Sequence, residues 1–171
     1  MEKSIENAKA CEIIIRKAGY PGLVTQYSYA KSLGNSAARW AECQLVDVHS
    51  YYQHPSGGMK PGSRVRQSSS IENFASYWRG TNSTKLVGRP FSVGEFNHSF
   101  WNPYRYEIGM IFAGYSALES YGAICIHSDA VKTNISEISV ACFTCAESPL
   151  IRASQFISAC MFQRGDVKSS P

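Results

Sequence analysis

The chain has 171 residues, of which 44% are apolar and 18% charged, a composition typical of one globular domain with a hydrophobic core. The net charge of +4 is spread along the sequence without a concentrated basic face, which argues against a nucleic-acid partner. No apolar run is long enough to cross a membrane and the first residues lack the apolar core of a signal peptide, so we expect no membrane partner and no secretion leader in this chain.

The first third of the chain alternates helical and strand-like segments. Apolar residues at helical spacing predict a helix over residues 2–18. A strand is expected at Leu23–Tyr27, and Asn35 is then expected to cap a short helix. Leu45–Val48 predicts a second strand, so this region has the rhythm of βα units.

The middle of the chain continues this alternation. A long loop rich in glycine, serine and proline runs to about Ser68, and loops of this length are usually functional or disordered. Ser69 and Glu72 have the spacing of a capping box and predict the start of a helix. The third strand is expected at Pro90–Val93 and leads directly to Glu95.

The last third contains two cap signals in which proline follows a capping residue. Asn102 with Pro103 predicts a helix from about Tyr104 to Ser120, and Ser148 with Pro149 predicts a last helix that runs through Phe162. A fourth strand is expected at Ala123–Ile126. The segment Asp129–Glu147 carries no clear pattern.

Four strands alternating with helices predict an α/β fold with a parallel sheet, equal to half of an eight-stranded (β/α)8 barrel. We expect one domain over residues 1–171 that is incomplete on its N-terminal side. Four parallel strands cannot close a barrel, and an isolated half would leave both sheet edges without partners. The predicted domain therefore requires a missing N-terminal half or self-association.

The six cysteines lie at irregular spacing, mostly inside apolar segments, which predicts reduced core thiols rather than a disulfide framework. Cys142 and Cys145 have the spacing of half a zinc site, but no second pair follows at a matching interval. We expect no metal and no cofactor. The localisation stays open, with a secreted longer parent protein as one alternative.

Polar side chains follow three of the predicted strands, and in a βα barrel such strand ends converge on one face. The candidates are His49, Tyr51 and His54 after the second strand, Glu95, Asn97 and His98 after the third, and His127 and Asp129 after the fourth. A carboxylate among histidine and tyrosine side chains is a reasonable catalytic group.

Four segments carry a resemblance to a known family: Asp47–Pro55 (DVHSYYQHP), Gly88–His98 (GRPFSVGEFNH), Asn102–Glu107 (NPYRYE) and Phe162–Val167 (FQRGDV). Together they resemble the second half of cellulase-like (β/α)8 glycoside hydrolases of the large retaining clan. The resemblance covers the chain from about residue 23 to residue 167. It implies a TIM-barrel half with strands five to eight, and hydrolysis of O-glycosidic bonds in an oligo- or polysaccharide.

The resemblance implies roles for particular residues. Glu95 falls at the end of strand seven, where the clan has its nucleophile, and His49 and Tyr51 would lie beside it as hydrogen-bond donors. The implied substrate-binding residues are His49, Tyr51, His54, Asn97, His98, Trp101 and His127. Further sugar platforms would be Tyr52, Phe100 and Tyr104.

The sequence departs from the clan at two points. The retaining mechanism needs a second carboxyl group as acid/base, which in the clan follows strand four and is missing from this chain. Glu107 and Glu119 fall within a predicted helix and are interpreted as solvated or capping charges. His127 stands where the clan commonly has an aromatic floor for the sugar.

Two other functions stay open. A non-catalytic carbohydrate-binding or interaction module, formed by a self-associating half barrel, would use the aromatic loops to hold a glycan. A metal-dependent hydrolase would use Asp47, His49, His54 and His98, because carboxylate and imidazole are zinc ligands.

Overall fold

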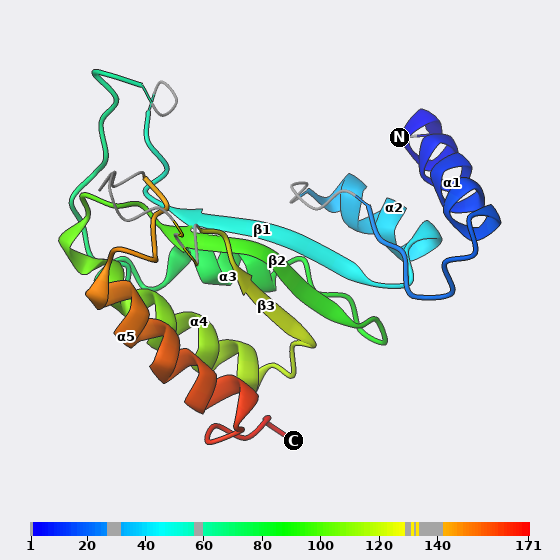
Figure 1. Cartoon of the computed structure of the whole chain (residues 1–171). Helices are drawn as coiled ribbons and strands as arrows, with labels where there is room; N and C mark the ends of the chain where they lie inside the picture. Colours follow the sequence, from blue (N-terminus) through cyan, green and yellow to red (C-terminus); the bar gives the residue numbers. More distant parts are fainter. Residues whose placement is uncertain (1, 27–31, 57–59, 129–130, 132, 134–141) are drawn as a thin grey trace.

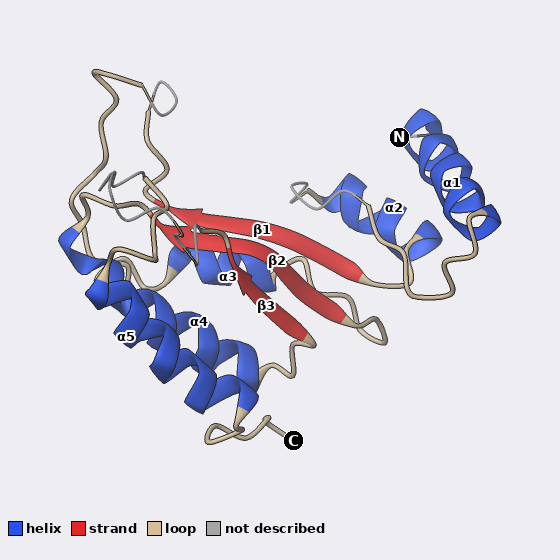
Figure 2. Cartoon of the chain, viewed as in Figure 1, coloured by secondary structure: helices blue, strands red, loops and turns tan. Residues whose placement is uncertain are grey.

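The computed structural model of the chain describes residues 2–26, 32–56, 60–128, 131, 133 and 142–171. These residues form an α/β structure (Figure 2). Its elements, in chain order, are α1 (Glu2–Lys17), α2 (Leu33–Glu42), β1 (Val46–Tyr52), α3 (Ser76–Asn82), β2 (Phe91–His98), the 3-10 helix η1 (Pro103–Tyr106), α4 (Glu107–Leu118), β3 (Ala123–Ile126), α5 (Pro149–Ser158) and the π-helical turn η2 (Ala159–Gln163).

The three strands form one parallel sheet in the order β1-β2-β3. Helices α3, α4 and α5 lie on one side of it, with α5 packed on α4 (Figure 1). The core lies between this side of the sheet and the helices. Its most buried apolar members are Val46, Val48, Phe91, Val93, Ile108, Phe112, Cys145 and Ile151, and Phe96 packs with them.

An extra residue in β2 sets which side chains face the core. Val48 pairs with Val93 but the next residue, His49, pairs with Glu95, so Gly94 has no partner of its own. The register against β3 shifts at the same place. Because strand side chains alternate, this bulge places Glu95 on the open face and the following Phe96 in the core.

The bulge position requires glycine for a steric reason. A Cβ atom at Gly94 would lie 2.7 Å from Oδ2 of Asp47 on the neighbouring strand. That separation is below van der Waals contact, so the absence of a side chain allows β2 to approach the Asp47 carboxylate.

Helices α1 and α2 form an arm that extends away from the sheet (Figure 1). The predicted helix over residues 2–18 is confirmed as α1, but only Ala8 in it is fully buried, while Ile13 and Ile14 are exposed. The strand predicted at Leu23–Tyr27 is not formed over residues 23–26, which are irregular. One backbone hydrogen bond, from Gln44 N to Val24 O, holds this segment. Tyr27 lies outside the described residues. Residues 23–26 have no neighbouring strand to complete a ladder.

The cap signals are confirmed in two helices and corrected in two others. Asn102 Oδ1 accepts a hydrogen bond from Tyr104 N at 2.8 Å, and Ser148 Oγ accepts one from Ile151 N at 3.4 Å. The first of these caps starts η1, which leads into α4. The capping residue of α2 is Ser32 rather than Asn35, whose backbone N–H donates to the Ser32 hydroxyl.

The capping-box serine Ser69 does accept a bond from Glu72 N, but the helix starts later, at Ser76. The reason is local: Phe74 and Ala75 have positive φ values of 53° and 47°, which interrupt helical geometry. Non-helical turns therefore occupy the positions at which the sequence predicts the first turn of the helix, and α3 begins after them.

All six cysteines are free thiols, as predicted, although only Cys43, Cys142 and Cys145 are buried. Within the described parts of the chain, no helix combines the length and the apolar character needed to cross a membrane.

Candidate functional site

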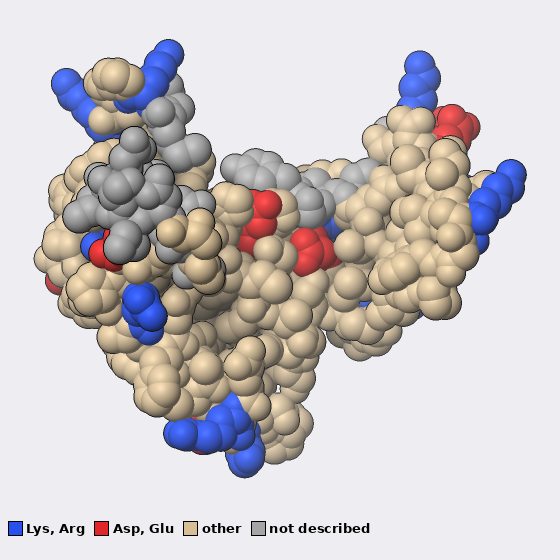
Figure 3. Space-filling model, in the orientation of Figure 1, with Lys and Arg blue, Asp and Glu red and all other residues tan. Residues whose placement is uncertain are grey.

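The open face of the sheet carries the candidate site. Figure 3 shows a hollow between the loops at the carboxyl ends of the strands and the α1–α2 arm, with acidic side chains on its floor. In β1, alternate residues Asp47, His49 and Tyr51 face this hollow, opposite the buried set that packs on the helices. Glu95 joins them from β2 because of the bulge at Gly94.

Glu95 is the centre of the cluster. The Tyr51 hydroxyl donates a short hydrogen bond to Oε2 of Glu95, and His49 Nδ1 lies 3.3 Å from the same oxygen. His127 approaches from the end of β3, with Nδ1 at 3.8 Å. The Glu95 side chain keeps 34% of its surface exposed, so this carboxylate is oriented by its neighbours and still open to a ligand.

A second carboxylate lies behind His49. Asp47 Oδ2 is 3.8 Å from His49 Nε2, and Oδ1 of Asp47 accepts a hydrogen bond from the Ser92 hydroxyl. The imidazole of His49 is therefore placed between two carboxylates, one on each side of the ring. Contacts on both sides restrict the orientation of the ring.

Aromatic rings form a wall beside the cluster. The Phe143 ring lies 4.9 Å from Tyr51, 5.6 Å from His54 and 5.7 Å from His127, measured between centroids. His54 and His127 both meet Tyr51 edge to face. The predicted residues Tyr51, His54 and His127 are thus brought together with Glu95.

No signal in the sequence points to Phe143. It lies in the segment between residues 129 and 147, where no periodic pattern points to a face or an element. A single aromatic residue in such a segment carries no signal of where its ring packs. The predicted Asp129 lies outside the described residues.

Asn97 is close to the cluster but is enclosed. Its Nδ2 donates to the backbone oxygen of His127 at 2.7 Å, its Oδ1 accepts from His98 N, and only 1% of its surface is exposed. The side chain connects β2 to the end of β3, which is a positioning contact for His127. The expectation that Asn97 contacts a substrate is not supported by this geometry.

His98 was predicted as a substrate-binding residue, but it faces the core. It is 2% exposed and its Nε2 lies 2.7 Å from the Tyr77 hydroxyl of α3. Burial lowers the pKa of His98 to about 3, so the ring is neutral over the physiological range. The alternation of β2 after the bulge explains this placement, because His98 shares a face with Phe96.

Three other aromatic residues predicted to stack on a sugar, Tyr52, Phe100 and Tyr104, differ in their exposure to solvent. Tyr52 is buried, with its hydroxyl bonded to the backbone oxygen of Ser69 at 2.7 Å, so it packs rather than binds. Phe100 lies beneath the guanidinium of Arg105, with 4.6 Å from that group to the ring centroid. Tyr104 is half-buried on η1.

Trp101 is 57% exposed and lies in a groove next to the Glu95 cluster, lined also by Pro55, Lys60 and Cys142. Its φ of 20° is unusual for a bulky residue. Trp101 is therefore the most accessible of the predicted platforms.

The sequence predicts that Glu107 is a solvated or a capping charge, and the prediction of a solvated charge is wrong. Its carboxylate is 2% exposed and accepts bonds from both the hydroxyl and the N–H of Ser70, from the Ser69 hydroxyl and from Ile71 N, at 2.6 to 3.2 Å. It anchors the loop before α3 to the start of α4. Burial and the nearby charge of Glu107 raise the pKa of Tyr77. Glu119, by contrast, is half-exposed and pairs with Lys85.

The metal site considered from the sequence is not assembled. His98 lies on the other side of the sheet from Asp47 and His49. Among the residues that the structure describes, no group of three or more histidine, cysteine or acidic side chains is arranged to hold a metal ion.

Comparison with protein-family models, with curated proteins and with solved structures finds no match for the chain in any of the three. The functional argument therefore depends on the geometry around Glu95.

Proposed function

We propose that the chain is the C-terminal half of a retaining glycoside hydrolase-like (β/α)8 barrel, with Glu95 as the nucleophile of the complete barrel. One observation carries the proposal: Glu95 is an accessible carboxylate in the second half of the parallel strand β2, on the open face of the sheet, held by Tyr51 and His49. The bulge that turns Glu95 toward the open face supports it, since bulges are frequent next to active sites.

The arrangement of helices supports a barrel-like assembly. Helices cover one side of the sheet while the other side carries the polar cluster, as the outer and inner sides of a (β/α)8 barrel would. Three parallel strands are formed among the described residues. The fourth strand of the proposed half would have to form at about residues 23–27 once a neighbouring strand is present.

The proposed reaction has two steps. A carboxylate oxygen of Glu95 attacks the anomeric carbon, the bond from that carbon to the leaving oxygen breaks, and a glycosyl ester forms. Water then attacks the same carbon and releases Glu95 as a carboxylate. In the first step the Tyr51 hydroxyl orients the attacking carboxylate, and the ring wall at Phe143 excludes water on one side.

Among the described residues of the cluster, Asp47 is the second carboxylate, and its two oxygens are engaged by Ser92 and His49 rather than free to act as a general acid. Loss of a general acid costs roughly 10²-fold or more with a poor leaving group. We therefore expect the isolated chain to act only on glycosides whose leaving group needs no proton.

This expectation gives a direct test. The chain is incubated with fluorinated deoxy-glycosides carrying a dinitrophenolate leaving group, which departs without protonation and allows the glycosyl ester to accumulate. Intact-mass measurement should show one added glycosyl group, and peptide mapping should locate it on Glu95.

Two variants control the test. Glu95→Gln should abolish labelling, while Glu72→Gln, at an exposed glutamate on another part of the surface, should leave it unchanged. Equal labelling of both variants, or no labelling of the folded wild type with a panel of sugars, would contradict the proposal.

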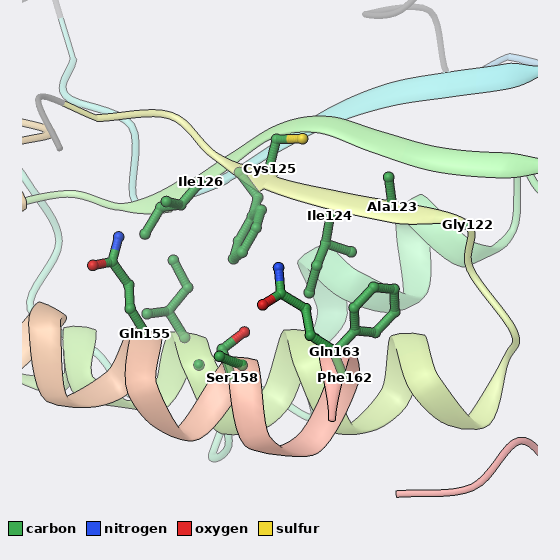
Figure 4. Close-up of a pocket in the computed structure, with 13 residues that line it drawn as sticks. Gly122, Ala123, Ile124, Cys125, Ile126, Gln155, Ser158, Phe162 and Gln163 are labelled. Carbon is green, nitrogen blue, oxygen red and sulfur yellow. The ribbon is translucent and has the colours of Figure 1, made fainter. Parts of the chain in front are cut away.

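A carbohydrate-binding module formed by two copies of the chain is the second candidate, favoured by the open sheet edges. In the described part of the chain, β1 and β3 each have a neighbouring strand on one side only. Beside β3 lies a pocket of about 480 Å³, toward which Gln155 and Gln163 point (Figure 4). Sedimentation that shows a cooperatively unfolding dimer would support this candidate, and a folded monomer at all concentrations would remove it.

A further inference from the structure

The groove that contains Trp101 is a separate hollow next to the Glu95 cluster. It has a volume of about 370 Å³, and its walls come from the long loop after β1, from Trp101 and from Cys142. A smaller groove lined by Val65 and Gln67 adjoins it, and the two share Trp101 and Ser63. One exposed indole therefore lines both grooves.

A tight turn builds one wall of this groove. Lys60 O accepts a hydrogen bond from Ser63 N at 3.0 Å, with Pro61 and Gly62 between them and a φ of 88° at Gly62. The Ser63 hydroxyl also accepts a bond from Lys60 N at 3.2 Å. Proline followed by a left-handed glycine is the sequence that such a turn requires, so Lys60 is presented from a defined backbone.

Hydrogen bonds hold the loop in place at both ends. Ser56 N donates to Arg64 O at 2.9 Å, which closes the part of the loop that carries the turn. Nearer the sheet, Ser68 accepts a bond from Gln53 at its hydroxyl and one from Asn102 at its backbone oxygen. The groove wall is thereby fixed to β1 and to the cap of η1.

The loop is positively charged throughout. Between residues 53 and 71 the sequence contains Lys60, Arg64 and Arg66 and no aspartate or glutamate. None of the ion pairs found among the described residues uses these three side chains. A positive field without an internal counter-ion favours an anionic ligand.

The groove and the Glu95 cluster share a wall. His54 and Phe143 contact the ring of Tyr51, and their chain neighbours Pro55 and Cys142 line the groove. A chain-like ligand bound across this wall would place one unit at Glu95 and another at Trp101.

We propose that the groove binds a sugar ring bearing a carboxylate, so that the glycan recognised by this protein is acidic. This inference rests on the proposed glycan-directed function and gives it a substrate class. The flat indole of Trp101 and the face of Pro55 provide apolar surface for the ring, and Lys60 provides the positive charge for its carboxylate. The carboxylates at Glu95 and Asp47 would disfavour the same acidic unit in the neighbouring cluster.

The test is a titration of the chain with trigalacturonate and with neutral cellotriose, followed by tryptophan fluorescence and by calorimetry. The chain has three tryptophans, of which Trp78 is buried and Trp40 is exposed on α2. We expect trigalacturonate to bind about fivefold or more tightly than cellotriose, with a preference that falls as salt is added.

Three variants locate the binding site. Trp101→Ala should weaken both ligands about tenfold or more, because the stacking surface is lost. Lys60→Gln should weaken trigalacturonate about two- to fivefold and leave cellotriose unchanged, as expected for one solvent-exposed charge pair. The matched control Trp40→Phe, at the other exposed tryptophan, should change neither affinity.

Equal affinity for the two sugars, or binding that survives Trp101→Ala, would overturn the inference. If Trp101→Ala fails to fold, the Lys60 variant and the salt dependence still decide the result. Glu95 labelling distinguishes this inference from the proposed function. Labelling of Glu95 without a preference for trigalacturonate would refute only the acidic-sugar groove. Preferred binding of trigalacturonate without labelling of Glu95 would refute only the proposed hydrolase function.

Discussion

The two faces of the sheet use the same residue types for opposite purposes. On the covered face, His98 is bonded to Tyr77, and Glu107 of α4 accepts four hydrogen bonds in a buried site. On the open face, His49 and Glu95 lie 3.3 Å apart and remain accessible. The role of a histidine or glutamate in this structure therefore depends on whether its side chain lies on the covered or the open side of the sheet.

Burial explains the difference between the faces. A buried charge or polar group needs partners, because the energy lost on leaving water is otherwise not recovered. Glu107 has a full set of such partners and therefore stabilises the fold. Glu95 has fewer partners and keeps contact with solvent, which is what a group that must react with a ligand needs.

The largest effect on stability is expected from a substitution on the covered face, at Glu107. Glu107→Ala leaves the buried donors of Ser69 and Ser70 without their acceptor, and the free energy of unfolding should fall by about 3 kcal/mol or more. Urea unfolding measures this. The control Glu95→Gln, on the open face, should change stability by less than about 1 kcal/mol; similar losses in the two variants would show that the faces do not differ as described.

The next effect comes from His98 and depends on pH. Its folded pKa of about 3 lies below its ordinary value of 6.5, so the unfolded chain binds the proton first and stability falls as the pH falls. Between about pH 7 and pH 5 the free energy of unfolding should drop by about 2 kcal/mol from this residue. His98→Gln should remove that part of the slope. An equal pH dependence of wild type and variant would show that His98 is not buried in a neutral form.

A smaller effect is expected at the bulge that separates the two faces. Gly94→Ala adds a Cβ atom that meets the Asp47 carboxylate, and this should destabilise the chain by about 1 to 2 kcal/mol. The double variant Gly94→Ala with Asp47→Ala removes the clash and should recover most of that loss relative to Asp47→Ala alone. Additive losses in this cycle would show that the two side chains do not meet.

The smallest effect on stability is expected at Tyr51. Tyr51→Phe removes one partly exposed hydrogen bond to Glu95 and should cost less than about 1 kcal/mol in unfolding experiments. Labelling of Glu95 by activated glycosides should nevertheless slow about tenfold, because the carboxylate loses an orienting contact. A variant that labels at the wild-type rate would show that Tyr51 has no part in the chemistry.

The sequence predicts local structure well where the signal is local. The fourth predicted strand agrees with β3 at both ends, and the Asn102 and Ser148 caps are formed. These features depend on residues within one or two turns of each other. The Glu95 cluster was predicted in part, because neighbouring parallel strands bring their side chains together. The predicted strand ends at Val48 and Val93 are wrong, since β1 and β2 continue to Tyr52 and His98 and contain the cluster residues His49, Tyr51 and Glu95.

The remaining features depend on contacts between distant residues. The bulge at Gly94 requires the register against β1 and β3, which no local pattern contains. Glu107 is buried because Ser70 lies beside it, 37 positions earlier in the chain. Val24 has no complete strand neighbour, so the strand predicted around it does not form.

The bulge also divides β2 into two segments that differ in register. Before it, Phe91 and Val93 are registered against the first half of β1; after it, Glu95 is registered against His49 and the second half. A small shift of the first segment is absorbed at Gly94, where the backbone is already irregular. Substitutions that repack the core around Phe91 can therefore accumulate without changing the orientation of the Glu95 carboxylate.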